Sequence, residues 1–312
     1  MTRDRTAGIT LALGAAAVSG VAVFVNSYGV RAVPDATVYT TAKNLVAAVV
    51  LAVVAALVAR RRTDRERRDR PRLQPRQIVG LAAVAAIGGS IGFVLFFEGL
   101  ARASSTQAAF LHKTLIVWVA VLAVIILRER LGLLHVAAIA VLVAGQAVLS
   151  GGVSSLRFGV GEWLVLAATV VWSAETVLVS WLLREVPVRY VALARMAGGT
   201  ALLMAWLVVT GRWSTLVGLS AEGWLWAVVT GLILAGYVAL WISALAKAPA
   251  IDVTAVLVPA AVVTGVLNVV VNQAPVTPSN TTGMLVVLVG AALAIGAATS
   301  RPALGSRPRE SL

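Results

Sequence analysis

Long apolar segments, separated by short polar connections, run along the whole chain. The hydrocarbon core of a bilayer is ~30 Å thick, and a helix needs about 20 mostly apolar residues to cross it. The pattern therefore predicts an all-α membrane protein with ten transmembrane helices, in which neighbouring helices are antiparallel. Their predicted ranges are 7–26, 36–59, 77–100, 104–127, 132–150, 161–183, 190–209, 222–246, 251–271 and 281–299.

The first of these segments could instead be read as a signal peptide. Its apolar stretch is nearly 20 residues long, whereas the apolar region of a signal peptide has about 7–15 residues and precedes an A-x-A cleavage site. No clean site of that kind follows the stretch. The longer stretch favours a first transmembrane helix.

Lysine and arginine are distributed unevenly between alternate connections. If the N-terminus is cytoplasmic, 19 of the 26 lysines and arginines lie in cytoplasmic segments and four lie in external ones. Cytoplasmic connections carry the excess of basic residues in membrane proteins, so both termini are expected in the cytoplasm, the C-terminal one as a tail, 300–312. The Arg-rich loop 60–76 contains three acidic residues and no aromatic one, which favours a solvated cytoplasmic anchor over a nucleic-acid site.

The overall composition narrows the classes of function. The chain is 60% hydrophobic and 12% charged, against about 45–50% and about 25% in a soluble domain. It has no cysteine, and its two histidines, His112 and His135, are too few for a His-rich metal cluster. No HExxH motif occurs. We therefore expect neither an enzyme nor a bound cofactor or metal.

The second half of the chain repeats features of the first. The segment GLARASSTQAAF (99–110) aligns with ALAKAPAIDVTA (244–255) at an offset of 145 residues, and the same offset aligns VLVAGQAVL (141–149) with VVLVGAALA (286–294). Each copy holds five predicted spans. Because five is odd, the second copy must cross the membrane in the opposite sense. Inverted repeats of this kind are typical of secondary transporters, which bind substrate near the midplane between the repeats.

At these segments, and at LRERLGLLHVAAIAVLVAGQAVL (127–149) and ALAKAPAIDVTAVLVPA (244–260), the sequence resembles EamA-domain transporters of the drug/metabolite transporter (DMT) superfamily. The resemblance implies two EamA-like five-helix repeats, at 7–150 and 161–299, in a carrier that works by alternating access. The family commonly has an acidic residue after the ninth span, which VNQAPVTP (271–278) lacks, although Glu129 occupies the matching place after the fourth. Pro259 stands where the ninth span usually carries a proline, and Thr114 is aligned with it.

Polar side chains inside the spans are the candidate binding residues. An ionisable group at bilayer depth costs at least ~2.5–3.5 kcal/mol, so it usually faces a cavity or a partner. Two tryptophans near span centres cannot be explained by the interfacial belt of aromatic residues. The substrate-binding candidates are Lys43, Asn44, Glu98, His112, Lys113, Thr114, Trp118, Trp172, Glu175 and Arg195.

Helical geometry assigns roles to some of these candidates. At about 100° per residue, Thr114 and Trp118 lie on one face of the fourth span with Gln107, Lys113 lies on an adjoining strip that faces the central cavity, and His112 points toward another helix. The polar stripes Thr37–Thr40–Thr41–Asn44 and Thr169–Ser173–Thr176–Ser180 are each expected to line the cavity. Interhelical hydrogen bonding is the alternative for both.

Charge pairing within the spans has two interpretations. Glu98 is expected to pair with Lys113 or Lys43, and Glu175 with Arg195. Either these pairs only neutralise one another, or one cation stays free for an anionic or zwitterionic substrate while Glu98 or Glu175 takes up protons. Asp252 is expected to cap the ninth span, and Glu129 is read as a loop charge.

The favoured function is a secondary transporter of a small polar or amphipathic metabolite in a bacterial plasma membrane, with export implied by the family resemblance. A broad-specificity multidrug exporter and a non-transporting membrane scaffold are the alternatives. The expected partners are a small-molecule substrate and the lipid bilayer, but not nucleic acid. Protons as coupling ion and a second copy of the chain in a homodimer are left open.

Overall fold

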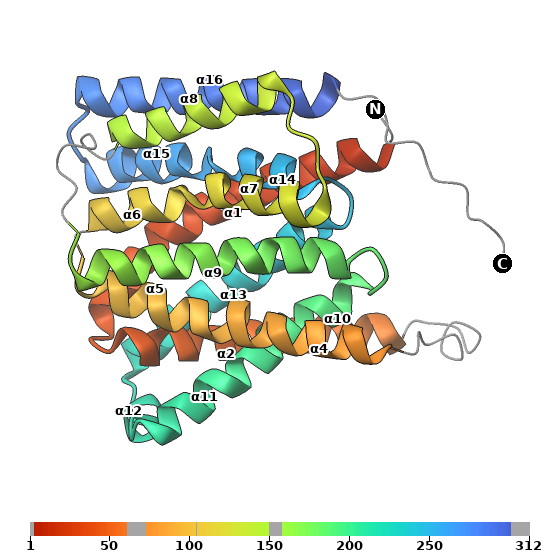
Figure 1. The fold of residues 1–312 in the computed structure, drawn as a ribbon. Helices are drawn as coiled ribbons and strands as arrows, with labels where there is room; N and C mark the ends of the chain where they lie inside the picture. The colour runs from red at the N-terminus through yellow and green to blue at the C-terminus, as the bar shows by residue number, and fades with distance from the viewer. Residues whose placement is uncertain (1–2, 61–72, 104, 150–157, 301–312) are drawn as a thin grey trace, which may run out of the picture.

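A computed structural model describes residues 3–60, 73–103, 105–149 and 158–300. Most of the basic loop predicted at 60–76, and the tail predicted at 300–312 apart from Ser300, lie outside these residues. Within them the chain is helical and contains no strand. The long helices lie side by side in one bundle, and the described ends of α1 and α16 lie at the same end of it (Figure 1).

The helices of the first half are α1 (Arg3–Ala32), α2 (Ala36–Arg60), α4 (Pro75–Ala83), the π-helical η1 (Val84–Ile91), α5 (Gly92–Leu100), α6 (Ser105–Lys113), α7 (Leu115–Leu127) and α8 (Leu133–Leu149). Those of the second half are α9 (Val160–Leu182), α10 (Val188–Leu193), the π-helical η3 (Ala194–Gly198), α11 (Gly199–Val209), α12 (Trp213–Val217), α13 (Ala221–Leu245), α14 (Ala250–Leu257), α15 (Ala260–Asn272) and α16 (Pro278–Ser300). Several predicted spans are therefore built from two or three consecutive helical pieces.

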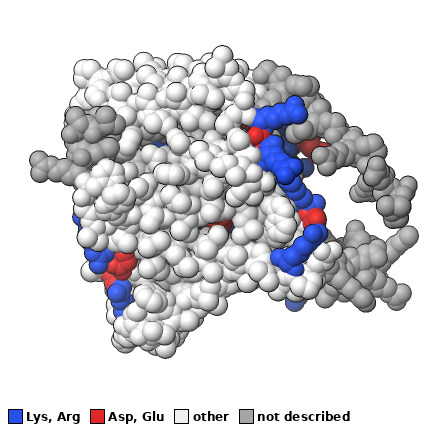
Figure 2. All heavy atoms as spheres, viewed as in Figure 1, with Lys and Arg blue, Asp and Glu red and all other residues white. Residues whose placement is uncertain are grey.

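The outer surface is that of a multi-pass membrane protein. Nine helical stretches among the described residues are long and apolar enough to cross a bilayer. The stretch predicted at 132–150 forms the shorter helix α8, with 17 described residues packed along α16. On the face shown in Figure 2, charged side chains gather at the two ends of the molecule, and the surface between them is almost entirely uncharged. Large apolar side chains such as Val53, Ile125 and Val209 are exposed on this surface, as contact with lipid requires.

The first helix is longer than the predicted range 7–26, because its polar residues do not end it. The Asn26 side-chain amide donates to the carbonyl of Ala22, and the Ser27 hydroxyl donates to that of Phe24. These polar groups are thus satisfied by the helix itself. The helix stops at Ala32, two residues before Pro34, where a proline disfavours the helical conformation of the residue before it.

The internal repeat is visible in the backbone at the offset seen in the sequence. Helices α7 and α15 each follow a break in a longer helix, at Thr114 and at Pro259 respectively. Both end in a residue with a left-handed backbone, Arg128 (φ 56°) and Gln273 (φ 51°). In each case 145 positions separate the two residues. Since a threonine and a proline produce the same break, the shape belongs to the repeat rather than to the proline alone.

The two halves run in opposite directions through the bundle. Helix α1 starts at the end of the bundle where α16 stops, whereas α9 starts at the other end (Figure 1). Helices of the two halves are interleaved, because α13 packs against both α1 and α2 and α9 packs against α5 and α7. The space between the halves is therefore lined by both.

Two glycine contacts set the distance between the halves. Gly89 of η1 lies against the backbone of η3, where a side-chain Cβ would overlap the carbonyl oxygen of Arg195. Gly231 of α13 lies against α2 in the same way, and a Cβ there would come within 2.7 Å of the carbonyl oxygen of Lys43. Small residues allow such close helix contacts. Each of these contacts therefore positions the backbone of a helix that carries an intramembrane cation.

Replacing Gly89 with alanine is expected to lower the thermal stability of the purified protein markedly, because a backbone group must move to admit the new Cβ, at a cost of about 1–3 kcal/mol. Gly236→Ala is the matched control, since a Cβ at Gly236 meets nothing within 4 Å. Thermal unfolding in detergent measures both variants. Equal melting temperatures for the two would contradict the proposed role of the Gly89 contact.

Candidate functional site

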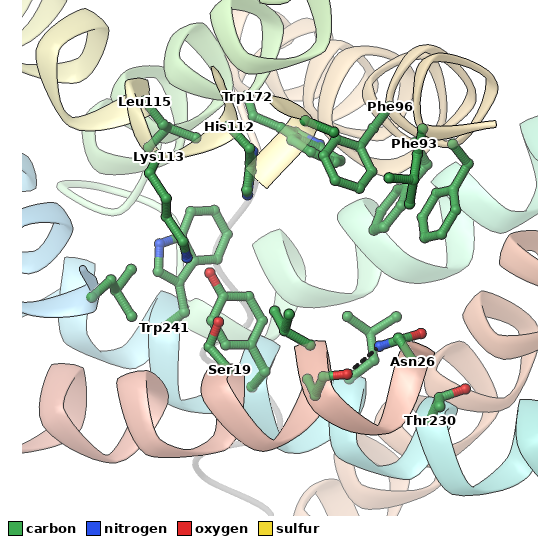
Figure 3. A pocket seen from close by; sticks show the side chains of 18 of the residues that line it. Ser19, Asn26, Phe93, Phe96, His112, Lys113, Leu115, Trp172, Thr230 and Trp241 are labelled. Atoms are coloured by element: carbon green, nitrogen blue, oxygen red, sulfur yellow. Dashed lines mark hydrogen bonds between the residues drawn. The ribbon is translucent and has the colours of Figure 1, made fainter. Parts of the chain in front are cut away.

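A central cavity of about 550 Å³ lies between the two halves. Its walls come from α1, α2, α5, α6, α7, α9, η3, α13 and α14, and Figure 3 shows side chains from several of them converging on one space. Six of the predicted binding residues line it, namely Lys43, His112, Lys113, Trp172, Glu175 and Arg195. The cavity extends to Arg31 and Leu100, at the end of the bundle opposite to that of the chain ends.

Lys43 on α2 is buried, with 4% of its surface exposed. Its ammonium donates to Asn26 Oδ1 at 3.1 Å and lies 4.4 Å from the ring centroid of Phe97. The rings of Tyr39 and Phe93 lie within 6 Å of it as well. Aromatic faces attract a cation, and more strongly when water is excluded. Lys43 is thus held by an amide oxygen and three rings, and not by Glu98 as the sequence had suggested.

Glu175 on α9 and Arg195 on η3 form the predicted ion pair. Arg195 Nε lies 2.6 Å from Glu175 Oε1, and Nη2 lies 3.2 Å from Oε2. This is the two-point geometry that strengthens guanidinium–carboxylate pairs. Both side chains are almost fully buried. The carboxylate fits only because residue 88 is a glycine, since a Cβ there would overlap it.

Gly88 and Gly92 both leave room for side chains of α9. A Cβ on Gly92 would come within 3 Å of the Trp172 indole, just as one on Gly88 would overlap Glu175. Trp172 Nε1 also donates to the carbonyl of Gly88 at 3.2 Å. The two glycines thus position two cavity side chains.

Lys113 and His112 both reach the cavity from the end of α6 (Figure 3). The His112 ring lies edge-to-face against Phe96 and Trp172, with centroids 5.1 and 5.2 Å away. His112 thus contacts other helices, as predicted, and lines the cavity as well. Lys113 is half-buried, and among the described residues it has neither an ion pair nor a hydrogen bond. Its ammonium is therefore available to a ligand.

Two predicted residues of the fourth span lie away from the cavity. Trp118 is on the outer surface of α7, 38% exposed, and the hydroxyl of Thr114 donates back to the carbonyl of Leu111. The prediction assumed a continuous helix, but the chain tightens at Thr114, whose amide lies 3.2 Å from the Leu111 oxygen and 3.3 Å from that of Phe110. The rotation of 100° per residue therefore cannot be used across this break to predict which face Trp118 lies on.

Asn44 and its polar stripe also lie outside the cavity. Thr37, Thr40, Thr41 and Asn44 are completely buried in the contacts of α2, and Asn44 donates to the carbonyl of Thr40. In the second stripe Thr176 lines the cavity, but Thr169 and Ser173 donate to their own helix. The prediction of cavity lining was wrong for the first stripe and holds for one residue of the second.

Glu98 lies at the end of the bundle rather than in its centre. Its carboxylate pairs with Arg102 at 2.7 Å and with Arg212 at 3.2 Å, and it accepts a hydrogen bond from Thr37. The predicted pairing with Lys113 or Lys43 was therefore wrong. Arg102 and Arg212 are in connections, and only the fold brings Arg212 to Glu98.

Sequence reasoning missed several residues that hold or line the site. Asn26 accepts from both Lys43 and the Tyr39 hydroxyl, and Tyr237 and Trp241 line the cavity opposite α6. Asn26 is the last residue of the predicted first span. A polar residue is ordinary at such a position, so Asn26 did not stand out as a candidate. The two aromatic rings of α13 carry no signal that separates them from ordinary membrane-helix residues.

A second polar cluster connects helices at the end of the bundle near Arg5. Asp252, 1% exposed, pairs with Arg5 of α1 at 2.6 Å and with His135 of α8 at 3.2 Å. The Glu129 carboxylate accepts hydrogen bonds from the amides of Ala250 and Ile251, at the start of α14. Asp252 is thus not the cap. Glu129 does lie in a connection, between α7 and α8, and it caps the helix that Asp252 had been expected to cap.

Comparison with known proteins agrees with this architecture. The model of the EamA-like transporter family matches the chain twice, over residues 6–151 and 159–296. One crystal structure of another protein is similar with a TM-score of 0.75 and 20% sequence identity, covering 92% of this chain and 98% of that one. At that identity the likeness shows the fold alone. No curated protein sequence matches the chain.

A double-mutant cycle on Glu175 and Arg195 is expected to reveal strong coupling. Glu175→Gln or Arg195→Gln alone should lower the stability by about 3 kcal/mol or more, since each leaves a buried charge without its partner. The double variant should lose less than the sum of the two, as judged by thermal unfolding in detergent. The exposed pair Arg76–Glu185 is the control, with a coupling of about 1 kcal/mol or less. Additive effects at the buried pair would contradict the assignment.

Proposed function

We propose, from the premise that the chain belongs to the EamA-like transporter family, that it is a secondary transporter of a small anionic or zwitterionic metabolite. The observation that carries this proposal is the central cavity, which lies between two oppositely directed halves and contains a lysine without a described partner. A cation in a low-dielectric cavity favours a ligand with negative charge. Export is the direction that the resemblance to the family suggests.

The proposal includes a membrane arrangement. We assign ten spans, with α8 as the tenth in addition to the nine longer helices, and two five-helix repeats at 7–150 and 161–299. The excess of lysine and arginine on the side of the chain ends supports cytoplasmic termini. A bacterial plasma membrane is the proposed location.

In this arrangement the described conformation faces outward. The cavity extends toward Arg31 and Leu100, whereas Arg5, Asp252, His135 and Glu129 connect α1, α8 and α14 at the cytoplasmic end. Transport by alternating access requires this end to open while the other closes. The polar cluster around Asp252 is therefore the proposed inner gate.

If transport is coupled to protons, Glu175 is the acid best placed to take up the proton. Of the two acids first considered, only Glu175 lines the cavity, and its protonation would release Arg195 from their ion pair. Glu98 instead joins two arginines at the end of the bundle. A substrate-dependent change in the protonation of Glu175 would therefore alter the cavity directly.

A broad-specificity multidrug exporter remains a second candidate, and the aromatic lining of the cavity favours it. Phe93, Phe96, Phe97, Trp172 and Trp241 all face the cavity, and aromatic walls accept varied flat ligands. The lysines in the same cavity would disfavour the cationic compounds that many such exporters carry. The charge of the ligand therefore separates the two candidates.

Untargeted comparison of metabolites, in cells and medium, is expected to show a metabolite that moves only when the chain is produced. Ser19→Trp should abolish that difference, because the indole would fill part of the cavity that Ser19 lines. Ser214→Trp, at an exposed position of α12, is the matched control and should retain it. If no metabolite responds to the chain, the non-transporting scaffold becomes the better account.

The inner gate is testable because the chain contains no cysteine. With one cysteine at Thr254, which lines the cavity on α14, Asp252→Asn should raise labelling by an impermeant maleimide from the cytoplasmic side several-fold. The reason is that the neutral amide no longer forms the ion pair with Arg5. Glu185→Gln removes an exposed ion pair at the same end and should leave labelling unchanged. Equal labelling of the two variants would contradict the gate.

A further inference from the structure

Three basic side chains lie within the helices around the cavity, and their surroundings differ. Arg195 is neutralised by Glu175 through two contacts. Lys43 is enclosed, with its ammonium against Asn26 and the rings of Tyr39, Phe93 and Phe97. Lys113 lines the same cavity, but among the described residues it has no carboxylate, hydrogen-bond acceptor or aromatic face assigned to it. The three cations are therefore not equivalent toward a ligand.

This difference identifies the group that meets a ligand's charge. A ligand anion would have to displace Glu175 to reach Arg195, and to displace Asn26 and the rings to reach Lys43. Neither displacement is needed at Lys113. Since a charged group at bilayer depth is stabilised by water or an opposite charge, a ligand that brings one negative charge to Lys113 gains the most.

The wall beside Lys113 is aromatic. His112, the preceding residue on α6, packs edge-to-face with Phe96 and Trp172, and Figure 3 shows these rings in the same cavity as Lys113. Phe96 and Trp172 also contact one another, with centroids 5.3 Å apart. Rings held in this way offer faces and edges to a flat ligand ring, and such aromatic pairs contribute beyond the area that they bury.

Size and charge at the entrance fit the same class of ligand. The cavity of about 550 Å³ falls in the range of about 300–1,000 Å³ that is usual for sites of single small molecules. Arg31 is exposed where the cavity reaches the end of the bundle, and a cation there attracts anions toward the site. Of the acids at this end, Glu98 and Asp35 are themselves paired with arginines.

We propose that the ligand is an aromatic monoanion, whose carboxylate binds Lys113 and whose ring packs against the wall formed by His112, Phe96 and Trp172. This inference deepens the proposed transport function and rests on it. Lys113 would then decide the charge of the substrate and the aromatic wall its shape, while Lys43 and Arg195 hold the helices around them.

The test measures binding to the purified full-length chain in detergent, apart from transport. Four probes are compared by ligand-dependent thermal shift and titration: indole-3-acetate, cyclohexylacetate, tryptamine and inorganic phosphate. We expect indole-3-acetate to bind most tightly, because only it combines a single negative charge with an aromatic ring. Tighter binding of tryptamine would overturn the proposal in favour of a cation carrier, and tighter binding of phosphate or cyclohexylacetate would overturn the aromatic part.

Variants separate the two halves of the proposal. Lys113→Gln should weaken indole-3-acetate binding by about tenfold or more, as the loss of a desolvated charge partner does, and Lys113→Arg should restore most of it. Lys247→Gln, which changes an exposed lysine paired with Asp4, is the control and should bind as the unmodified chain does. Phe96→Leu should reduce the preference for indole-3-acetate over cyclohexylacetate.

Failure of this inference is distinguishable from failure of the transport function. If Lys113→Gln binds indole-3-acetate as tightly as the unmodified chain does, or if none of the probes binds, the assignment of Lys113 and of the aromatic monoanion is overturned. A chain-dependent metabolite that Ser19→Trp abolishes would still support transport in that case. If no metabolite responds to production of the chain although the probes still bind, the transport function is overturned instead.

Discussion

The low dielectric of the bilayer is the constraint on which this structure depends. A charged side chain among the helices must find water, an opposite charge or an aromatic face, since its insertion costs at least ~2.5–3.5 kcal/mol. Arg195 meets this requirement with Glu175, and Lys43 with an amide oxygen and three rings. Of these three cations, only Lys113 has no protein partner among the described residues. All three cations line the cavity, and their partners determine which of them is open to a ligand.

Close backbone contacts make these environments possible. Gly89 and Gly231 bring helices of one half against the carbonyl oxygens of Arg195 and Lys43 in the other, and Gly88 leaves room for the Glu175 carboxylate. The π-helical turns of η1 and η3 lie at one of these contacts. There, the Ser90 hydroxyl donates to the carbonyl of Ala86. Irregular backbone at bilayer depth is tolerated where such groups are satisfied by protein.

The sequence predicted most of the fold and part of the site, for identifiable reasons. Helix positions follow from the length of apolar segments, and the repeat offset of 145 recurs in the backbone at Thr114 and Pro259. The Glu175–Arg195 pair could be proposed because each is a rare charge within a span. Trp118 was misplaced because helical periodicity does not extend across the break at Thr114. Arg212 as a partner of Glu98, and the partners of Asp252 and Glu129, could not be predicted, since they come from segments over 100 residues away that only the fold brings near.

The repeat is symmetric in backbone but not in charge, and this difference affects how the two ends can close. Glu129 caps the start of α14 through its carboxylate, whereas the residue 145 positions later is Ala274, which has no polar side chain to cap α6. The backbone contact at the two places is nevertheless alike: the amides of Glu129 and Ala274 donate to the carbonyl oxygens of Ala123 and Asn268, at 3.1 and 3.2 Å.

At the end without this cap, charges are instead supplied by Glu98, Arg102, Arg212 and Asp35. If the two halves exchanged roles, the closed end would no longer be held by the Glu129 cap and the buried Asp252. It would be held by the partly exposed network of ion pairs instead. Because exposed pairs contribute little stability and buried ones are sensitive to the loss of a partner, the two closed states of such a carrier would differ in free energy even though their helices are related by the repeat.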